Sequence, residues 1–216
     1  IVKIWSHQID SIFKYAQDAG KSTGIVTTTR VTHATPAAAY AISASRQWEG
    51  NDGTPEGCKD IADQLINGKI GKNLDVVFGG GLRYFLPVTE GGRRTDGRNL
   101  VKEYTLNNQR DGNRVALAFN KTHLNGINTR FFDKALGLFA SSHMDYKLLA
   151  DEESQPTLTE MTAKAIEMLE RNPNGFVLLV EGGRIDTSHH RNQAHLALGE
   201  VVEFHKAVEY VKANTN

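Results

Sequence analysis

The sequence predicts an α/β fold, a three-layer sandwich in which a mostly parallel central sheet lies between two layers of helices. Along the 216 residues, short apolar or β-branched runs alternate with stretches in which apolar residues recur at helical spacing. Because strands that alternate with helices pair in parallel, helices are expected on both faces of the sheet. No internal repeat or low-complexity tract interrupts the pattern, so residues 1–216 are predicted to form a single segment of one domain without an internal boundary.

The expected elements, in chain order, are helix 9–16, strand 24–29, helix 35–46, helix 61–66, strand 75–78, helix 158–169, strand 176–180 and a last helix from near Asp186 toward the end. The first helix stops before Gly20. Thr35-Pro36 has the form of an N-cap followed by proline at the first helical position, which predicts a helix through about Arg46. The helix 158–169 ends before Asn172-Pro173, because proline does not continue a helix.

Composition excludes two classes of partner. Twenty-five basic and twenty-five acidic residues give no net charge, so there is no electrostatic case for binding nucleic acid or an anionic membrane. No apolar run approaches the roughly 18 residues that cross a bilayer. The chain begins Ile1-Val2 without an initiator Met, as expected of an internal or processed start.

The segment from Glu181 to His190 carries candidate metal ligands at the carboxyl end of the strand 176–180. Ligands bind at that end of the strands in open α/β sheets. Asp186 and His190 are four residues apart, so one helix face would present both, and a carboxylate with an imidazole suits zinc. Glu181, with oxygen neighbours, suits magnesium. The alternative is that Asp186 caps the helix while His189 and His190 are solvated.

Thr35 and Arg46 each have a structural and a functional explanation. Thr35 could simply cap a helix, but the strands 24–29 and 176–180 would end at the same sheet edge and bring it near Glu181. Arg46 could be a surface cation near a helix C-terminus, or a guanidinium that holds two phosphate oxygens. His33 would lie beside this site, or be an exposed turn residue.

These residues resemble segments of a known family. Glu181-Gly-Gly-Arg-Ile-Asp186 followed by His-His is similar to the metal-binding segment of animal-type alkaline phosphatases, and 24–37 to the same family's strand-turn-helix. Arg46 then falls at the place of the family's phosphate-binding arginine. Further segments resemble the family in the same order: Cys58–Leu65, Asp75–Gly81, Asp96–Leu100 and Gly137–Phe139.

The resemblance implies an enzyme that hydrolyses phosphate monoesters, with two zinc ions and one magnesium ion, through a phosphoserine intermediate. It assigns Asp186 and His190 to zinc, Thr35 and Glu181 to magnesium, and Arg46 to the phosphoryl group of substrate or inorganic phosphate. His33 is similar to a histidine that lies beside the magnesium site in animal enzymes.

The family's nucleophilic serine and its remaining zinc ligands match no segment here, so the chain resembles the middle portion of a longer enzyme. The segment alone is expected to be inactive. The family's habits imply a homodimer at full length, an extracellular or cell-surface location and, in many members, a lipid anchor outside these residues.

Cys58 and Asn120 fit the same extracellular setting. Cys58 is either a buried free thiol or, as the resemblance implies, half of a disulfide with a cysteine outside this chain. Asn120-Lys-Thr122 is a glycosylation sequon that resembles one at the same place in animal members.

The chain also departs from the family. Thr187-Ser188 replaces the usual His-Gly, and Ala140 and Gln155 stand where animal enzymes place calcium-binding carboxylates, so no calcium site is predicted. Two alternatives remain. One is another metal-dependent enzyme such as a phosphodiesterase, sulfatase or mutase, and the other is a non-catalytic binding or receptor protein on the same fold.

Overall fold

The computed structural model describes residues 9–215, so the amino-terminal start interpreted above lies outside the described residues. A five-stranded sheet with the order β3-β4-β2-β1-β5 forms the centre, and every neighbouring pair is parallel. The strands are β1 (Ser22–Arg30), β2 (Val76–Gly80), β3 (Val115–Ala118), β4 (Lys134–Leu138) and β5 (Phe176–Glu181). The predicted α/β class is confirmed.

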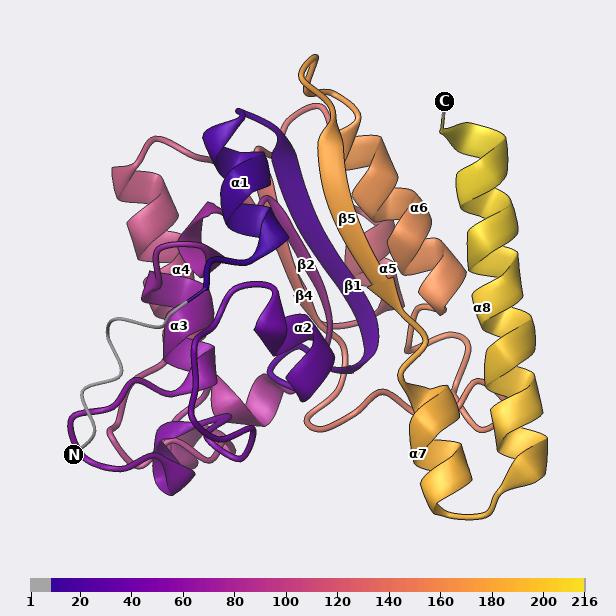
Figure 1. Cartoon of the computed structure of the whole chain (residues 1–216), viewed down its shortest axis with the longest axis horizontal. Helices are drawn as coiled ribbons and strands as arrows, with labels where there is room; N and C mark the ends of the chain where they lie inside the picture. The colour runs from indigo at the N-terminus through magenta and orange to yellow at the C-terminus, as the bar shows by residue number, and fades with distance from the viewer. Residues whose placement is uncertain (1–8, 216) are drawn as a thin grey trace.

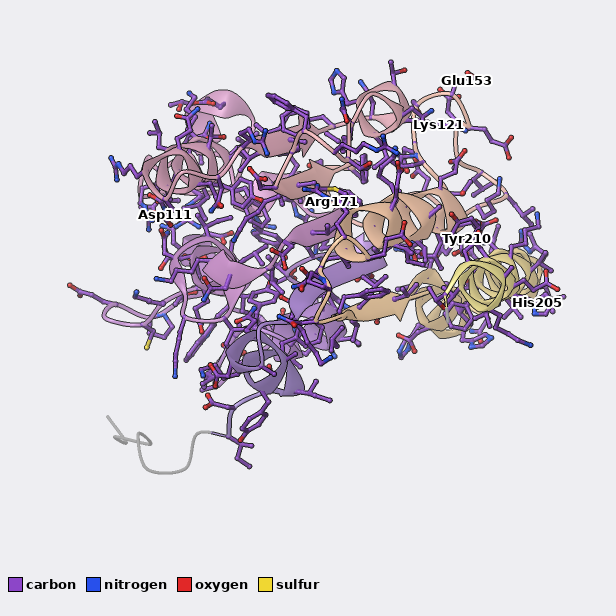
Figure 2. All side chains as sticks on the ribbon, turned by 90° about the horizontal axis from the view of Figure 1, so that it is seen from above. Asp111, Lys121, Glu153, Arg171, His205 and Tyr210 are labelled. Atoms are coloured by element: carbon purple, nitrogen blue, oxygen red, sulfur yellow. The ribbon has the colours of Figure 1, made fainter. Side chains whose placement is uncertain are left out.

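Helices cover both faces of the sheet (Figures 1 and 2). They are α1 (Ile12–Asp18), α2 (Ala34–Ala38), α3 (Ile61–Asn67), α4 (Leu100–Arg110), α5 (Lys121–Asn125), α6 (Leu158–Leu169), α7 (Arg184–His190) and α8 (Ala194–Asn214). One buried cluster joins the sheet to α1, α3 and α4, and a second joins it to α5, α6 and α8. No helix within residues 9–215 is long and apolar enough to cross a membrane.

The helix α6 shows how the sequence specifies an element. Thr157 and Glu160 form a capping box, in which each side chain accepts a hydrogen bond from the other's backbone N–H. Met161, Ala165 and Met168 recur at helical spacing and are buried in the second cluster. The cap therefore fixes where the helix begins, and the apolar stripe fixes which face meets the sheet.

The strands β1 and β2 are central, whereas β5 is an edge strand in the described part of the chain. Residues 23–29 of β1 are all buried, as expected for a parallel strand covered on both faces. β5 pairs with β1 alone among the described strands, and all of its residues are half-buried. Figure 1 shows β5 at the border of the sheet with α8 beyond it.

The predicted helix from Thr35 to Arg46 is wrong in length and in its cap. α2 ends at Ala38, and its N-cap is His33, so Thr35 lies inside the helix. Beyond it, the Gln64 side chain accepts a hydrogen bond from the Ile42 N–H and donates one to the Ile42 carbonyl. These side-chain bonds compete with the helical ladder for the backbone.

The predicted last helix is divided into α7 and α8. The break lies at Asn192, whose φ of 55° is left-handed, a conformation that asparagine tolerates better than most residues. The pattern also predicted no element between 81 and 157, where the structure has α4, β3, α5 and β4. β3 is only 4 residues long, too short for a clear alternation.

Candidate functional site at the carboxyl ends of β1 and β5

The carboxylate of Glu181 is held by two threonines of the neighbouring strand. Glu181 ends β5 and is the register partner of Thr27 on β1. Its Oε2 accepts a hydrogen bond from the Thr27 hydroxyl at 2.7 Å and one from the Thr29 hydroxyl at 3.2 Å. Both threonines are buried and point the same way, because alternate residues of a strand share a face. The carboxylate is therefore fixed in direction through its Oε2.

The glycines after Glu181 let the chain turn tightly over β1. A Cβ at Gly183 would collide with the Thr29 methyl group and would lie 3.0 Å from the Glu181 carboxyl carbon. The next residue, Arg184, donates its backbone N–H to the Thr28 hydroxyl at 3.3 Å. The strand exit is thus bonded to β1, and α7 starts directly beneath the strand end, as Figure 1 shows.

Asp186 and His190 lie together on one face of α7. The distance from Asp186 Oδ1 to His190 Nε2 is 3.5 Å, and the two side chains are 69% and 77% exposed. The helix begins at Arg184, two residues before the predicted start. Exposed, adjacent oxygen and nitrogen donors of this kind form half of a tetrahedral zinc shell.

Thr35 is exposed on α2, at the carboxyl end of β1. The structure gives no contact between its side chain and Glu181. Its neighbour His33 is half-buried, and it lies close enough for Glu181 to influence its titration. Burial, together with the guanidinium groups of Arg30 and Arg46, nevertheless lowers the pKa of His33 below its ordinary value.

Arg46 lies beyond α2 in an exposed turn, and its guanidinium is directed by a histidine. Its Nη2 donates to His33 Nε2 at 3.0 Å. The guanidinium remains exposed and makes no ion pair with any residue in the range 9–215, so its remaining donors are available to an anion.

A buried ion pair that the sequence analysis did not identify lies beside this group. Arg30, the last residue of β1, donates to both Glu49 oxygens at 2.7 Å, and the two side chains are 12% and 6% exposed. Thr32 donates to the same carboxylate at 2.7 Å. His143, in the loop after β4, contacts Arg30 through its Nε2, which lies 2.7 Å from the Arg30 Nη1.

Sequence reasoning missed four residues of this site, and only two of them had a recognisable signal in the sequence. Thr27 and Thr29 belong to the quoted run before Arg30, and hydroxyls at alternate positions near a strand's carboxyl end were a usable signal. Glu49 and His143 lie in loops without periodicity, 19 and 113 residues from their partner Arg30. Only the folded structure brings them together.

The residues present supply incomplete metal shells. Within residues 9–215, no group of three or more His, Cys, Asp or Glu side chains is arranged to hold a metal ion. The donor chemistry nevertheless fits the predicted ions. Glu181 offers a half-buried, oriented carboxylate among hydroxyls, as magnesium prefers, and Asp186 with His190 offers the mixed oxygen and nitrogen set of zinc.

The structure also shows the surroundings of Cys58, Asn120 and Gln155, which lie outside the candidate metal site. Cys58 is exposed, so its alternative interpretation as a buried thiol is wrong. Asn120 is the N-cap of α5, and its Oδ1 accepts a hydrogen bond from the His123 N–H at 2.8 Å. Gln155, where no calcium ligand was predicted, uses its amide to bond the backbone and the side chain of Asp145.

Comparison with known proteins extends the local match to the whole chain. The model of the family described as alkaline phosphatase matches residues 2–216. The membrane-bound alkaline phosphatase of Bombyx mori is 47% identical over 216 residues, covering 94% of this chain and 39% of the relative. The tissue-nonspecific isozyme of Homo sapiens is 42% identical over 218 residues, covering 94% of this chain and 41% of the relative. The chain therefore spans well under half the length of these relatives.

Solved structures agree with the sequence comparison. The alkaline phosphatase of Thermus thermophilus superposes with a TM-score of 0.77 at 32% identity, over 93% of this chain and 37% of that one. A cold-active enzyme from Shewanella sp. gives a TM-score of 0.72 at 29% identity, over 97% of this chain and 44% of that one. A variant of the enzyme from the Antarctic bacterium TAB5, at 25% identity, is described with Mg bound in the M3 site. Because the family model matches residues 2–216 of the chain and solved members share its fold, the chain belongs to the alkaline phosphatase family.

Proposed function

We propose that the complete protein containing this chain hydrolyses phosphate monoesters as a zinc- and magnesium-dependent alkaline phosphatase. The observation that carries the proposal is that the oriented carboxylate of Glu181 ends β5, and that the exposed Asp186–His190 pair lies on α7, the helix that follows this end of β5. Family membership over residues 2–216 supports the same reaction class.

Each residue has a defined task in this proposal. Asp186 and His190 would bind zinc, whereas Glu181 and Thr35 would bind magnesium. When bound, these cations would supply positive charge that polarises phosphate oxygens. Thr27 and Thr29 hold the Glu181 carboxylate in one orientation, so the site needs little reorganisation to accept an ion.

Arg46 would bind the phosphoryl group. A guanidinium is planar and always charged, and it can donate to two phosphate oxygens at once. Its bond to His33 uses Nη2 and leaves other donors of the group directed to solvent. Arg46 would therefore orient the substrate and stabilise the negative charge that gathers on the equatorial oxygens.

The chain is proposed to be the middle of a longer polypeptide. The rest of that polypeptide would supply the remaining zinc ligands and the nucleophilic serine, which would form the phosphoserine intermediate. The matched relatives are more than twice as long as the aligned segment. An apolar surface on α8 supports this proposal, with exposed side chains of Leu198, Val201, Val202 and Val208. We accordingly expect the isolated segment to lack phosphatase activity.

Further properties of the complete protein follow from the family. They are a homodimeric state, an extracellular or cell-surface location with a lipid anchor outside this chain, a glycan on Asn120 and a disulfide from Cys58 to a cysteine elsewhere. The exposure of Cys58 supports the last of these, because an exposed thiol is accessible to a partner. One matched relative, from Bombyx mori, is named a membrane-bound enzyme.

A substrate panel with metal analysis tests the proposal. The complete protein should hydrolyse phosphate monoesters far faster than diesters or sulfate esters, and should contain stoichiometric zinc and magnesium. A preference for diesters or sulfates would indicate another enzyme of the wider group. Absence of both turnover and metal would indicate a binding protein. Robust turnover of an aryl phosphate by the isolated segment would disprove that the nucleophile lies elsewhere.

A further inference from the structure

His143 lies where three distant segments of the chain meet. It follows β4, and its ring contacts Arg30 at the end of β1, with Nε2 2.7 Å from the guanidinium Nη1 and Nδ1 3.3 Å from the backbone nitrogen. Its ring also meets the His33 ring edge-on, with the centroids 5.0 Å apart. His143 therefore separates the buried Arg30 from the histidine that bonds Arg46.

These contacts form one continuous path. Glu49 holds Arg30 with two hydrogen bonds, Arg30 contacts His143, and His143 packs against His33. His33 in turn accepts the hydrogen bond of Arg46 at 3.0 Å. The exposed guanidinium of Arg46 is thus connected, through two imidazole rings in edge-to-face contact, to the ion pair of Arg30 with Glu49.

The electrostatics of the path require a neutral imidazole at position 143. A guanidinium and a peptide N–H can only donate, so both nitrogens of His143 face donors of Arg30, and a neutral ring accepts from one of them at a time. Burial, and next the Arg30 charge, lower the pKa of His143 to about 3. The ring therefore stays uncharged and packs beside His33 without repelling the nearby cations.

We propose that His143 is a positioning residue for phosphate binding, which holds the His33 ring in the orientation that lets it direct the Arg46 guanidinium. The proposal rests on the proposed function, in which Arg46 binds the phosphoryl group. It differs from a purely structural role, because Arg30 is bonded to Glu49 directly, by two hydrogen bonds in which His143 takes no part. Loss of the ring would free His33 and Arg46 rather than unfold the strand end.

The test uses the complete protein and inorganic phosphate as the probe. For His143→Ala, we expect the inhibition constant of phosphate and the KM for an aryl phosphate to rise roughly 3- to 10-fold, the range that one hydrogen bond supports. The thermal midpoint should change little. His123→Ala is the matched control, because His123 is an exposed histidine on α5, which contributes no residue to the proposed site, and it should leave both constants unchanged.

Two further variants distinguish the effect of the aromatic ring from the effect of its hydrogen-bonding nitrogen atoms. His143→Phe keeps an aromatic edge against His33 and should retain most of the phosphate affinity. His143→Gln keeps an acceptor for Arg30 but has no ring, so it should lose affinity as His143→Ala does. If His143→Ala fails to fold, comparing the phosphate affinities of His143→Phe and His143→Gln tests the same prediction. Equal affinities for the two variants would overturn the proposal.

A double variant tests the route through Arg46. In the Arg46→Ala background, His143→Ala should add almost no further loss of phosphate affinity, because the group that it positions is absent. A full additional penalty would overturn the proposal. Absence of phosphatase activity in the unaltered protein would instead refute the proposed function, and calorimetric titration with phosphate would still measure the effect of His143 on anion binding.

Discussion

Thr27 and Glu181 are register partners on adjacent parallel strands, and the threonine hydroxyl donates to the carboxylate at 2.7 Å across 154 residues of sequence. The bond is formed at the sheet edge where the candidate ligands gather. A strand pairing that stabilises the fold therefore also orients a proposed magnesium ligand.

The first prediction concerns this bond. In the complete protein, Thr27→Val should raise the magnesium concentration needed for half-maximal activity severalfold, because the half-buried Glu181 carboxylate loses its shorter hydrogen bond, worth about 1 kcal/mol. Magnesium titration of the metal-depleted enzyme measures the effect. Thr27→Ser keeps the hydroxyl and is the control. An identical magnesium requirement in the valine and serine variants would contradict the positioning role.

The second prediction concerns Arg94, whose side chain is 1% exposed. Its guanidinium bonds both Asp60 oxygens at 3.2 and 3.1 Å and also pairs with Asp96. Arg94→Met should lower the free energy of unfolding by about 3–5 kcal/mol, because it leaves the buried Asp60 carboxylate without its cationic partner. Denaturant unfolding measures this loss. Arg114→Met removes an exposed pair with Asp133 and should change stability little, so equal losses would refute the argument from burial.

The third prediction concerns pH. Burial raises the pKa of Glu200 above 4.5, although the Lys147 N–H bonds its carboxylate at 2.6 Å. The native state therefore keeps this proton more tightly than the unfolded chain does, and stability is lost as pH rises from 4.5 through the raised pKa. Glu200→Gln should thus raise the melting temperature at pH 8, with a gain that shrinks toward pH 4. A gain independent of pH would rule out titration of Glu200 as its cause.

The fourth prediction concerns the start of α6. Thr157→Ala removes the hydroxyl that accepts from the Glu160 N–H at 3.1 Å, and should cost about 1 kcal/mol. Hydrogen exchange should accelerate chiefly in the first turn of α6. Thr157→Ser preserves the cap and should exchange like the parent. Faster exchange spread evenly over the sheet would mean that the residue stabilises something other than the cap.

The sequence predicted best where the physical signal was local. The strand before Glu181 and the helix α6 combine β-branched or helical periodicity with clear stop signals, and both were expected within a residue or so of their observed bounds. The carboxyl end of α2 was misplaced, and there the side chain of Gln64, distant in sequence, hydrogen-bonds the backbone of Ile42. No pattern within 35–46 contains that information.

In the candidate site, too, local spacing was predictable from the sequence and long-range contacts were not. The four-residue spacing of Asp186 and His190 was enough to expect their side chains on one helix face, and the structure places them 3.5 Å apart. The buried contacts of Arg30 depend on Glu49 and His143, which tertiary packing brings to it from separate loops. The metal and phosphate roles of Thr35, Glu181 and Arg46 stay predictions.

The position of β5 at the end of the strand order determines when the site can form. β1 is synthesised well before its partner on that side, because Glu181 follows Thr29 by 152 residues of sequence. Until then, the unpaired edge of β1 and the hydroxyls of Thr27 and Thr29 remain open, and closing so long a loop is slow. A nascent chain that stops before Glu181 can form the β2 side of the sheet but cannot orient the carboxylate. Orientation of the Glu181 carboxylate is therefore a late event in folding, and an unfinished chain would present an open strand edge to chaperones.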